Sequence, residues 1–163
     1  RDMFLFSFYT RGMSFIDMAY LKKSDLKNSV IIYRRRKTGQ QLSIKWEKCM
    51  EEIIAKYNGC STAQYLLPII TNPCVNERTQ YRNAISRINV ALKEVACLAG
   101  LNMPLTMHCA RHCWASIAKS KNIPLSVISE GMGHDSEETT RIYLASLDTN
   151  VVDRANSLIL KDL

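Results

Sequence analysis

The chain has 163 residues, of which 47% are hydrophobic, so it is long enough to form one domain with a substantial core. Its formal net charge of +7 favours a polyanionic partner, although many soluble proteins are as basic. No apolar run reaches the length of a membrane span, and the short apolar N-terminus lacks the pattern of a signal peptide, so we expect no membrane partner. The chain starts without Met inside an expected helix, so we take its N-terminus as a boundary within a longer protein.

The first half of the chain predicts helices around a small β-sheet. Residues 2–21 have apolar residues at helical spacing and are expected to form a helix that is interrupted near Gly12. Apolar, β-branched runs within 30–44 flank a turn that contains Gly39, which predicts a β-hairpin, and residues 25–30 can add a third short strand. Two amphipathic helices are expected next, over residues 46–57 and 77–99. The predicted fold class is therefore mainly α with a small antiparallel β-sheet (α+β).

Further helices are expected in the C-terminal part. Thr106 is a suitable start for the first of them, Pro124 for the second, and Asp135 or Ser136 for the third. The core side of the second helix is expected to consist of Val127, Ile128 and Met132. The last expected amphipathic segment is Leu147 to Leu160.

Six cysteines are scattered along the chain, and none forms a Cys-x-x-Cys pair, so we expect free thiols in a reducing cytoplasm. Residues 108–113 offer two i,i+4 pairs of metal ligands, His108 with His112 and Cys109 with Cys113. These pairs lie on adjacent faces of a helix, and no second ligand pair is near in the sequence. The pattern is a weak indication of zinc, and we expect no metal site.

Four side chains in the C-terminal third carry the chemistry of phosphodiester attack. His108 and Arg111 are three residues apart, which places them on one face of a helix, about 5 Å apart along its axis. His134 follows a Gly-flanked turn, and Tyr143 lies on the next helix. Arginine binds non-bridging phosphate oxygens, histidine moves or orients protons, and tyrosine can form a covalent intermediate.

The order His-x-x-Arg-His, then Gly-His, then Thr-x-x-Tyr resembles the catalytic boxes of the tyrosine recombinases, the phage integrase family. The matching residues are His108, Arg111, His134 and Tyr143. The resemblance covers nearly the whole chain and implies one catalytic domain over residues 1–163, without the N-terminal DNA-binding domain of the family.

This resemblance implies an enzyme that cuts and rejoins DNA strands at specific sites. Tyr143 would form a 3′-phosphotyrosyl bond and release a 5′-hydroxyl, with no metal, ATP or other cofactor. The implied partners are double-stranded attachment sites, further protomers in a tetramer on DNA, and a DNA-bending accessory protein. The implied location is the bacterial cytoplasm, in association with the nucleoid.

The basic run 34–37 lies in the turn of the expected hairpin. It resembles the family's β-hairpin, whose lysine enters the minor groove beside the cut, and Lys37 is the matching residue. Arg34, Arg35 and Arg36 would bind DNA with it. A basic run of this length is also often a general backbone-binding or solvated patch.

The first box of the family, Thr-Gly-x-Arg-x-x-Glu, is incomplete in this chain. Asp17 matches the acid, but Ser14 stands where the phosphate-binding arginine belongs, as in a Bacteroides-type integrase. Arg11, one helical turn earlier, is our candidate for the missing guanidinium, although side chains of a regular helix would lean away from Ser14. Another arginine, or a site with only one arginine, remains open.

Three other functions fit parts of the pattern. A catalytically impaired DNA-binding protein of the same fold would explain Ser14. A topoisomerase-type enzyme would use the same chemistry to relax DNA. A helical interaction domain outside nucleic-acid biology would show no salt-dependent DNA binding.

Overall fold

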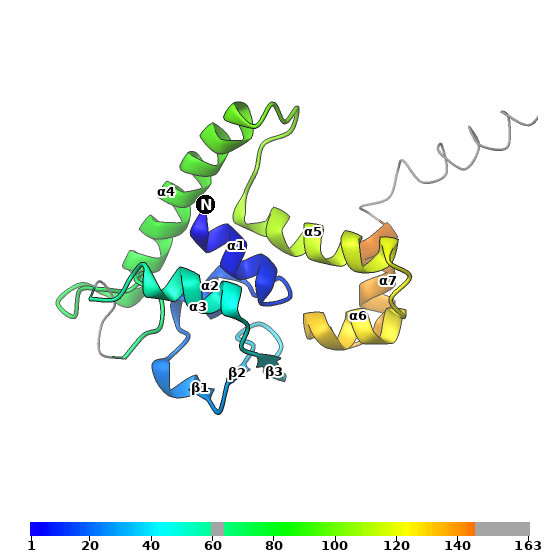
Figure 1. The fold of residues 1–163 in the computed structure, drawn as a ribbon, viewed down its shortest axis with the longest axis horizontal. Helices are drawn as coiled ribbons and strands as arrows, with labels where there is room; N and C mark the ends of the chain where they lie inside the picture. The colour runs from blue at the N-terminus through cyan, green and yellow to red at the C-terminus, as the bar shows by residue number, and fades with distance from the viewer. Residues whose placement is uncertain (60–63, 146–163) are drawn as a thin grey trace, which may run out of the picture.

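The computed structural model describes residues 1–59 and 64–145, and Figure 1 shows their arrangement. The elements are α1 (Asp2–Tyr9), α2 (Phe15–Ala19), the 3-10 turn η1 (Lys23–Asp25), β1 (Leu26–Lys27), β2 (Val30–Arg34), β3 (Gln41–Lys45), α3 (Lys48–Ala55), α4 (Glu77–Leu98), α5 (Met107–Ser120), α6 (Leu125–Met132) and α7 (Glu137–Ala145). This mainly helical fold with one small sheet confirms the predicted class. The predicted segment Leu147 to Leu160 lies outside the described residues.

The sheet is antiparallel in the order β1-β2-β3, as the hairpin pattern predicted. Ile31 pairs with Ile44 and Tyr33 with Leu42, and all four side chains are buried. Because neighbouring residues of a strand face opposite sides, the residues between them are exposed. The same alternation predicts that the first residue after β2 faces the buried side of the sheet.

The first helical stretch is broken between α1 and α2, as predicted. Arg11 and Gly12 both have left-handed backbone angles, with φ of 60° and 76°. The backbone N–H of Gly12 donates to Ser7 O (2.8 Å), and the Ser7 hydroxyl donates to Met13 O (2.7 Å). These buried bonds hold the turn in place against α5.

The described residues form two hydrophobic clusters. The larger one includes Phe6, Met18, Ile31, Leu67 and Leu92, from α1, α2, the sheet, the segment before α4, and α4 itself. The smaller one consists of Ala115, Ala118, Ile128, Met132 and Leu144 from α5, α6 and α7. Figure 1 shows α6 and α7 beside α5 and away from α4. Since Met107 at the start of α5 belongs to the larger cluster, α5 connects the two.

The core prediction for α6 was wrong at one position. Ile128 and Met132 are buried, but Val127 is 51% exposed because the helix packs through a narrower face than the apolar pattern suggested. In the part of the chain that the structure describes, no helix is long and apolar enough to cross a membrane.

Candidate active site

Arg111 lies at the junction of the two hydrophobic clusters, on the buried side of α5, and is only 6% exposed. Its Nη1 donates to Gly12 O (2.9 Å), and its Nη2 donates to Met132 O (2.7 Å) and to Nε2 of His134 (3.0 Å). Burial, followed by repulsion from Arg35, lowers the pKa of Arg111 to about 10, so the side chain is still charged at neutral pH. Three of its five N–H donors have protein partners, which leaves two for a ligand.

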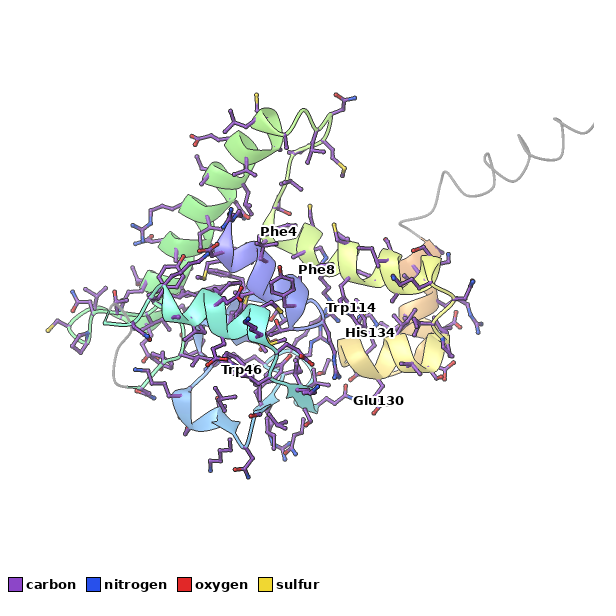
Figure 2. All side chains as sticks on the ribbon, in the orientation of Figure 1. Phe4, Phe8, Trp46, Trp114, Glu130 and His134 are labelled. Atoms are coloured by element: carbon purple, nitrogen blue, oxygen red, sulfur yellow. The ribbon has the colours of Figure 1, made fainter. Side chains whose placement is uncertain are left out.

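His134, which is labelled in Figure 2, follows Gly133, whose left-handed conformation (φ 65°) ends α6. Its Nδ1 lies 2.7 Å from the Thr140 hydroxyl. Since arginine can only donate, Nε2 accepts from Arg111, and Nδ1 therefore carries the proton and donates to Thr140. Burial, Arg111 and Arg35 lower the pKa of His134 to about 4, so its ring is neutral at pH 7.

Tyr143 on α7 places its ring among three imidazoles. The centroid of its ring is 5.0 Å from that of His112, 5.6 Å from His134 and 6.4 Å from His108. The charge of Arg111 favours the phenolate and acts to lower the pKa of Tyr143. Burial outweighs it and raises the pKa of Tyr143 to about 12, so attack by this phenol needs a group that accepts its proton.

His112 is a site residue that the sequence analysis considered only as a zinc ligand. Its ring stacks on Tyr143 at an interplanar angle of 14° and meets His108 edge-on at 4.3 Å. Its i,i+4 spacing from His108 was the signal that both rings share one side of α5. Within residues 1–59 and 64–145, no three His, Cys, Asp or Glu side chains gather as metal ligands. The stacked rings place His112 in the surroundings of Tyr143.

The basic run 34–37 starts at Arg34, the last residue of β2, and one of its four side chains points inward. Arg34, Arg36 and Lys37 are exposed, whereas Arg35 is buried and donates from Nη1 to Gly133 O. Lys37 lowers the pKa of both His108 and His134, so its charge lies close to the site. The run thus contributes the buried charge of Arg35 and the exposed charge of Lys37 to the site, whereas the guanidinium of Arg36 lies over the ring of Tyr20.

Ser14 and Asp17 fasten the hairpin to α2. The Ser14 hydroxyl donates to one oxygen of the Asp17 carboxylate (2.6 Å), and the other oxygen accepts from the backbone N–H of Arg36 (2.9 Å). Ser14 also caps α2 through the backbone N–H of Asp17. Through Asp17, Ser14 therefore helps to position the backbone of the basic run, and its hydroxyl is engaged in these contacts.

Arg11 lies at the edge of this group. The left-handed backbone at Arg11 and Gly12 removes the objection that a regular helix would direct its side chain away. Its Cδ lies beside Gly131, 3.6 Å from where a Cβ on that glycine would be. Its guanidinium makes no hydrogen bond or salt bridge with any other described residue. Its charge acts on Tyr33, whose pKa it lowers against a larger rise from burial.

Acid should destabilise the fold because burial lowers the pKa of all three histidines, His108, His112 and His134. An unfolded histidine has a pKa of about 6.5, so between that pH and about 4 the unfolded chain binds more protons than the folded chain. The free energy of unfolding should therefore fall as pH drops below 6.5. Each histidine contributes at most about 1.4 kcal/mol per pH unit, and less where solvent screens it.

Urea unfolding at pH 5 and pH 7 measures this effect. The His134→Asn variant removes the histidine with the largest shift and should have a shallower pH dependence than the unaltered chain. An identical slope in both proteins would contradict the assignment of His134 as a half-buried group that is neutral at pH 7.

Comparisons with known proteins identify the family and the fold of the chain. The profile of the phage integrase family matches residues 3–150. Among solved structures, the XerA recombinase matches with a TM-score of 0.65 at 18% identity, over 96% of this chain and 55% of that chain. A XerH recombinase in a post-cleavage complex with a palindromic difH substrate matches with a TM-score of 0.65 at 18% identity, over 96% of this chain and 45% of that one.

A third structure is a lambda integrase(75-356) dimer bound to a COC' core site, with a TM-score of 0.59 at 17% identity, over 88% of this chain and 51% of that one. The chain thus spans about half the length of the solved structures that it matches. A comparison with curated proteins found no match. Because the family profile covers most of the chain and the fold agrees, the chain belongs to the phage integrase family, the tyrosine recombinases, and has the fold of their catalytic domain.

Proposed function

We propose that this protein is a site-specific DNA recombinase that cuts and rejoins strands through a phosphotyrosyl intermediate. The observation that carries the proposal is the position of the Tyr143 ring among three imidazoles, one of which is bonded to the buried guanidinium of Arg111. A nucleophile, proton acceptors and an anion-binding group are thereby gathered in one place.

In this reaction the Tyr143 hydroxyl attacks the scissile phosphorus. A bond forms between the phenolic oxygen and phosphorus, the bond to the 5′-oxygen breaks, and the 3′ end stays attached to the protein. His108 is neutral at pH 7, because burial and Arg111 lower its pKa, and it can take the phenolic proton. Arg111 neutralises the charge that develops on the non-bridging oxygens. One phosphodiester replaces another, so no energy source is needed.

His134 takes a different part once the phosphate is bound. Its Nε2 accepts from Arg111 in the free protein and cannot donate to phosphate in that state. A phosphate oxygen that takes over the Arg111 N–H would leave Nε2 free, and the negative charge would raise the pKa of His134. Protonated His134 would then hold the same phosphate through Nε2.

Lys37 is the proposed general acid for the leaving 5′-oxygen. Replacing that bridging oxygen by sulfur gives a leaving group that needs no proton. Lys37→Ala should cut the oxygen substrate about 100-fold or more slowly and the sulfur substrate at nearly the normal rate, since general acids contribute about that much. Lys45→Ala removes another exposed lysine of the hairpin and is the control. Equal losses of Lys37→Ala on both substrates would mean that Lys37 only binds the backbone.

The proposed function is tested with full-length protein and sheared DNA from its own genome. Adducts that survive denaturant are isolated, the attached DNA is sequenced, and the linked residue is identified by mass spectrometry. We expect a few recurrent sites with phosphotyrosine at residue 143. Salt-sensitive DNA binding without any adduct would instead support the second candidate, a catalytically impaired DNA-binding protein, which Ser14 in place of the family arginine favours.

Partners and location follow from the same proposal. The substrates would be double-stranded attachment sites, bound by a tetramer of protomers with a DNA-bending accessory protein, in the bacterial nucleoid. Within the family, Ser14 supports assignment to the Bacteroides-type integrases that lack the usual first-box arginine. Arg34 and Arg36 are exposed beside Lys37 and would bind the DNA backbone.

A further inference from the structure

Arg35 differs from its neighbours in the basic run because it points inward. Ile31 and Tyr33 face the core from β2, and Arg35 continues that side of the strand by the period of two. Arg35 is 8% exposed, whereas Arg34 and Arg36 on either side are exposed. A side chain whose only task was to contact the DNA backbone from the surface would not need this burial.

Arg35 and Arg111 reach the same turn from different elements, the hairpin and α5. Arg111 donates to Met132 O, and Arg35 donates to the next carbonyl along the chain, Gly133 O. The stem of Arg35 also lies against Gly133, where an added Cβ would be 3.3 Å from its Cδ. Adjacent carbonyls at the end of a helix attract cations, which explains how two guanidiniums can be held together there.

These two cations have no carboxylate partner. No Asp or Glu among the described residues forms a salt bridge with Arg35 or Arg111. Asp17 is the buried acid in the area, but its oxygens accept from Ser14 and from the backbone of Arg36. Arg35 consequently lowers the pKa of Arg111 and of His134 by repulsion. Two buried, unneutralised guanidiniums are unfavourable unless an anion binds between them.

We propose that Arg35 supplies the second guanidinium of the phosphate site, in place of the arginine that Ser14 replaces. Arg35 and Arg111 bind the two non-bridging oxygens of the scissile phosphate, with His134 between them. Arg35 uses one of its five donors on Gly133 and keeps four for the phosphate. This assignment rests on the proposed strand-cleavage function and makes Arg35 a catalytic residue rather than a general DNA contact.

Arg11 is the competing candidate for the same task. Its side chain runs beside Gly131. Both arginines lower the pKa of Tyr33, but Arg35 also acts on Arg111 and His134. Arg11 lies in the turn before α2 and Arg35 in the turn after β2, so each can be replaced without touching the other.

The test measures cleavage of a nicked duplex built on the sequence recovered from the adducts. The variant Arg35→Met keeps the stem that packs on Gly133 and removes the charge. At saturating DNA we expect it to cleave at least 100-fold more slowly, because a preorganised donor to the transition state is lost, while the Kd for DNA changes less than about tenfold. Lys45→Met is the control: it makes the corresponding change at an exposed cation of the same hairpin, which pairs with Glu47, and it should cleave at a near-normal rate.

A neutral substrate separates charge neutralisation from structural damage. Replacing one non-bridging oxygen of the scissile phosphate by a methyl group removes the negative charge that Arg35 would neutralise. Arg35→Met should therefore lose much less activity on this methylphosphonate than on the phosphate, whereas a merely misfolded variant would lose both equally. Arg11→Met should cleave both the phosphate and the methylphosphonate substrate at nearly the normal rate.

The outcomes distinguish the two proposals. If the unaltered protein forms no adduct, the proposed function fails and the role of Arg35 fails with it. If the unaltered protein cleaves and Arg35→Met cleaves as fast as Lys45→Met, or loses phosphate and methylphosphonate activity equally, the role of Arg35 is wrong while the function stands. A large, charge-specific loss in Arg11→Met instead would assign the second guanidinium to Arg11.

Discussion

Tyr143→Phe should abolish formation of the covalent protein–DNA adduct. The substitution keeps the ring that packs against His112 and removes only the hydroxyl that would attack phosphorus. Folding and DNA affinity should therefore survive, and the loss of adduct should be complete rather than partial, because a phenylalanine ring has no nucleophile. The measurement is gel separation of the denatured adduct on the nicked duplex, together with DNA binding at the same protein concentration.

Tyr33→Phe is the informative control for that experiment. Tyr33 is the other phenol near Arg111, but it is 9% exposed and burial raises its pKa well above the usual range. Such a group is a poor nucleophile, so its removal should leave adduct formation intact. An adduct that persists in Tyr143→Phe and disappears in the double variant would transfer the nucleophile to Tyr33.

Local patterns in the sequence predicted most of the elements that position the site. The break near Gly12 and the hairpin around Gly39 depend on residues within a few positions of each other, and both are present. Thr106 is the N-cap of α5 and Gly133 the C-cap of α6, and both caps also depend on residues close to them in the sequence. The order of His108, Arg111, His134 and Tyr143 also allowed their recognition as one group before any distance was known.

The sequence alone did not predict which cation of the basic run is buried. A period-two pattern through Ile31 and Tyr33 would have selected Arg35, but a run of four basic residues looks uniform unless the strand is known to continue into it. The pKa of Tyr143 could not be predicted either. Its direction depends on how far burial outweighs Arg111, and that balance comes from tertiary packing.

Gly12→Ala should disable the site by a steric effect on Arg111. A Cβ on Gly12 would lie 2.7 Å from both Cα and Cγ of Arg111, and a backbone atom cannot move aside as a flexible side-chain end can. The left-handed φ of 76° adds strain of about 1 kcal/mol for alanine, and overpacking adds about 1–3 kcal/mol. The free energy of unfolding should therefore fall by about 2–4 kcal/mol, which lowers Tm by roughly 5–15 °C in a domain of this size.

Gly12→Ala should also slow cleavage, even at a temperature where the variant is folded, because Gly12 O accepts a hydrogen bond from the Arg111 guanidinium. Displacing α5 from the turn moves that guanidinium away from the phosphate, and losing one such donor costs about 100-fold or more in rate. Gly100→Ala is the matched control: its φ is 65°, and an added Cβ meets nothing within 4 Å. Gly100→Ala should lower the free energy of unfolding by about 1 kcal/mol and leave the cleavage rate unchanged. It shares the backbone strain of Gly12→Ala but not the steric contact. Cleavage is compared at a temperature where both variants are folded. Equal Tm values and equal cleavage rates for Gly12→Ala and Gly100→Ala would show that the close approach of Gly12 to Arg111 does not determine the position of the guanidinium.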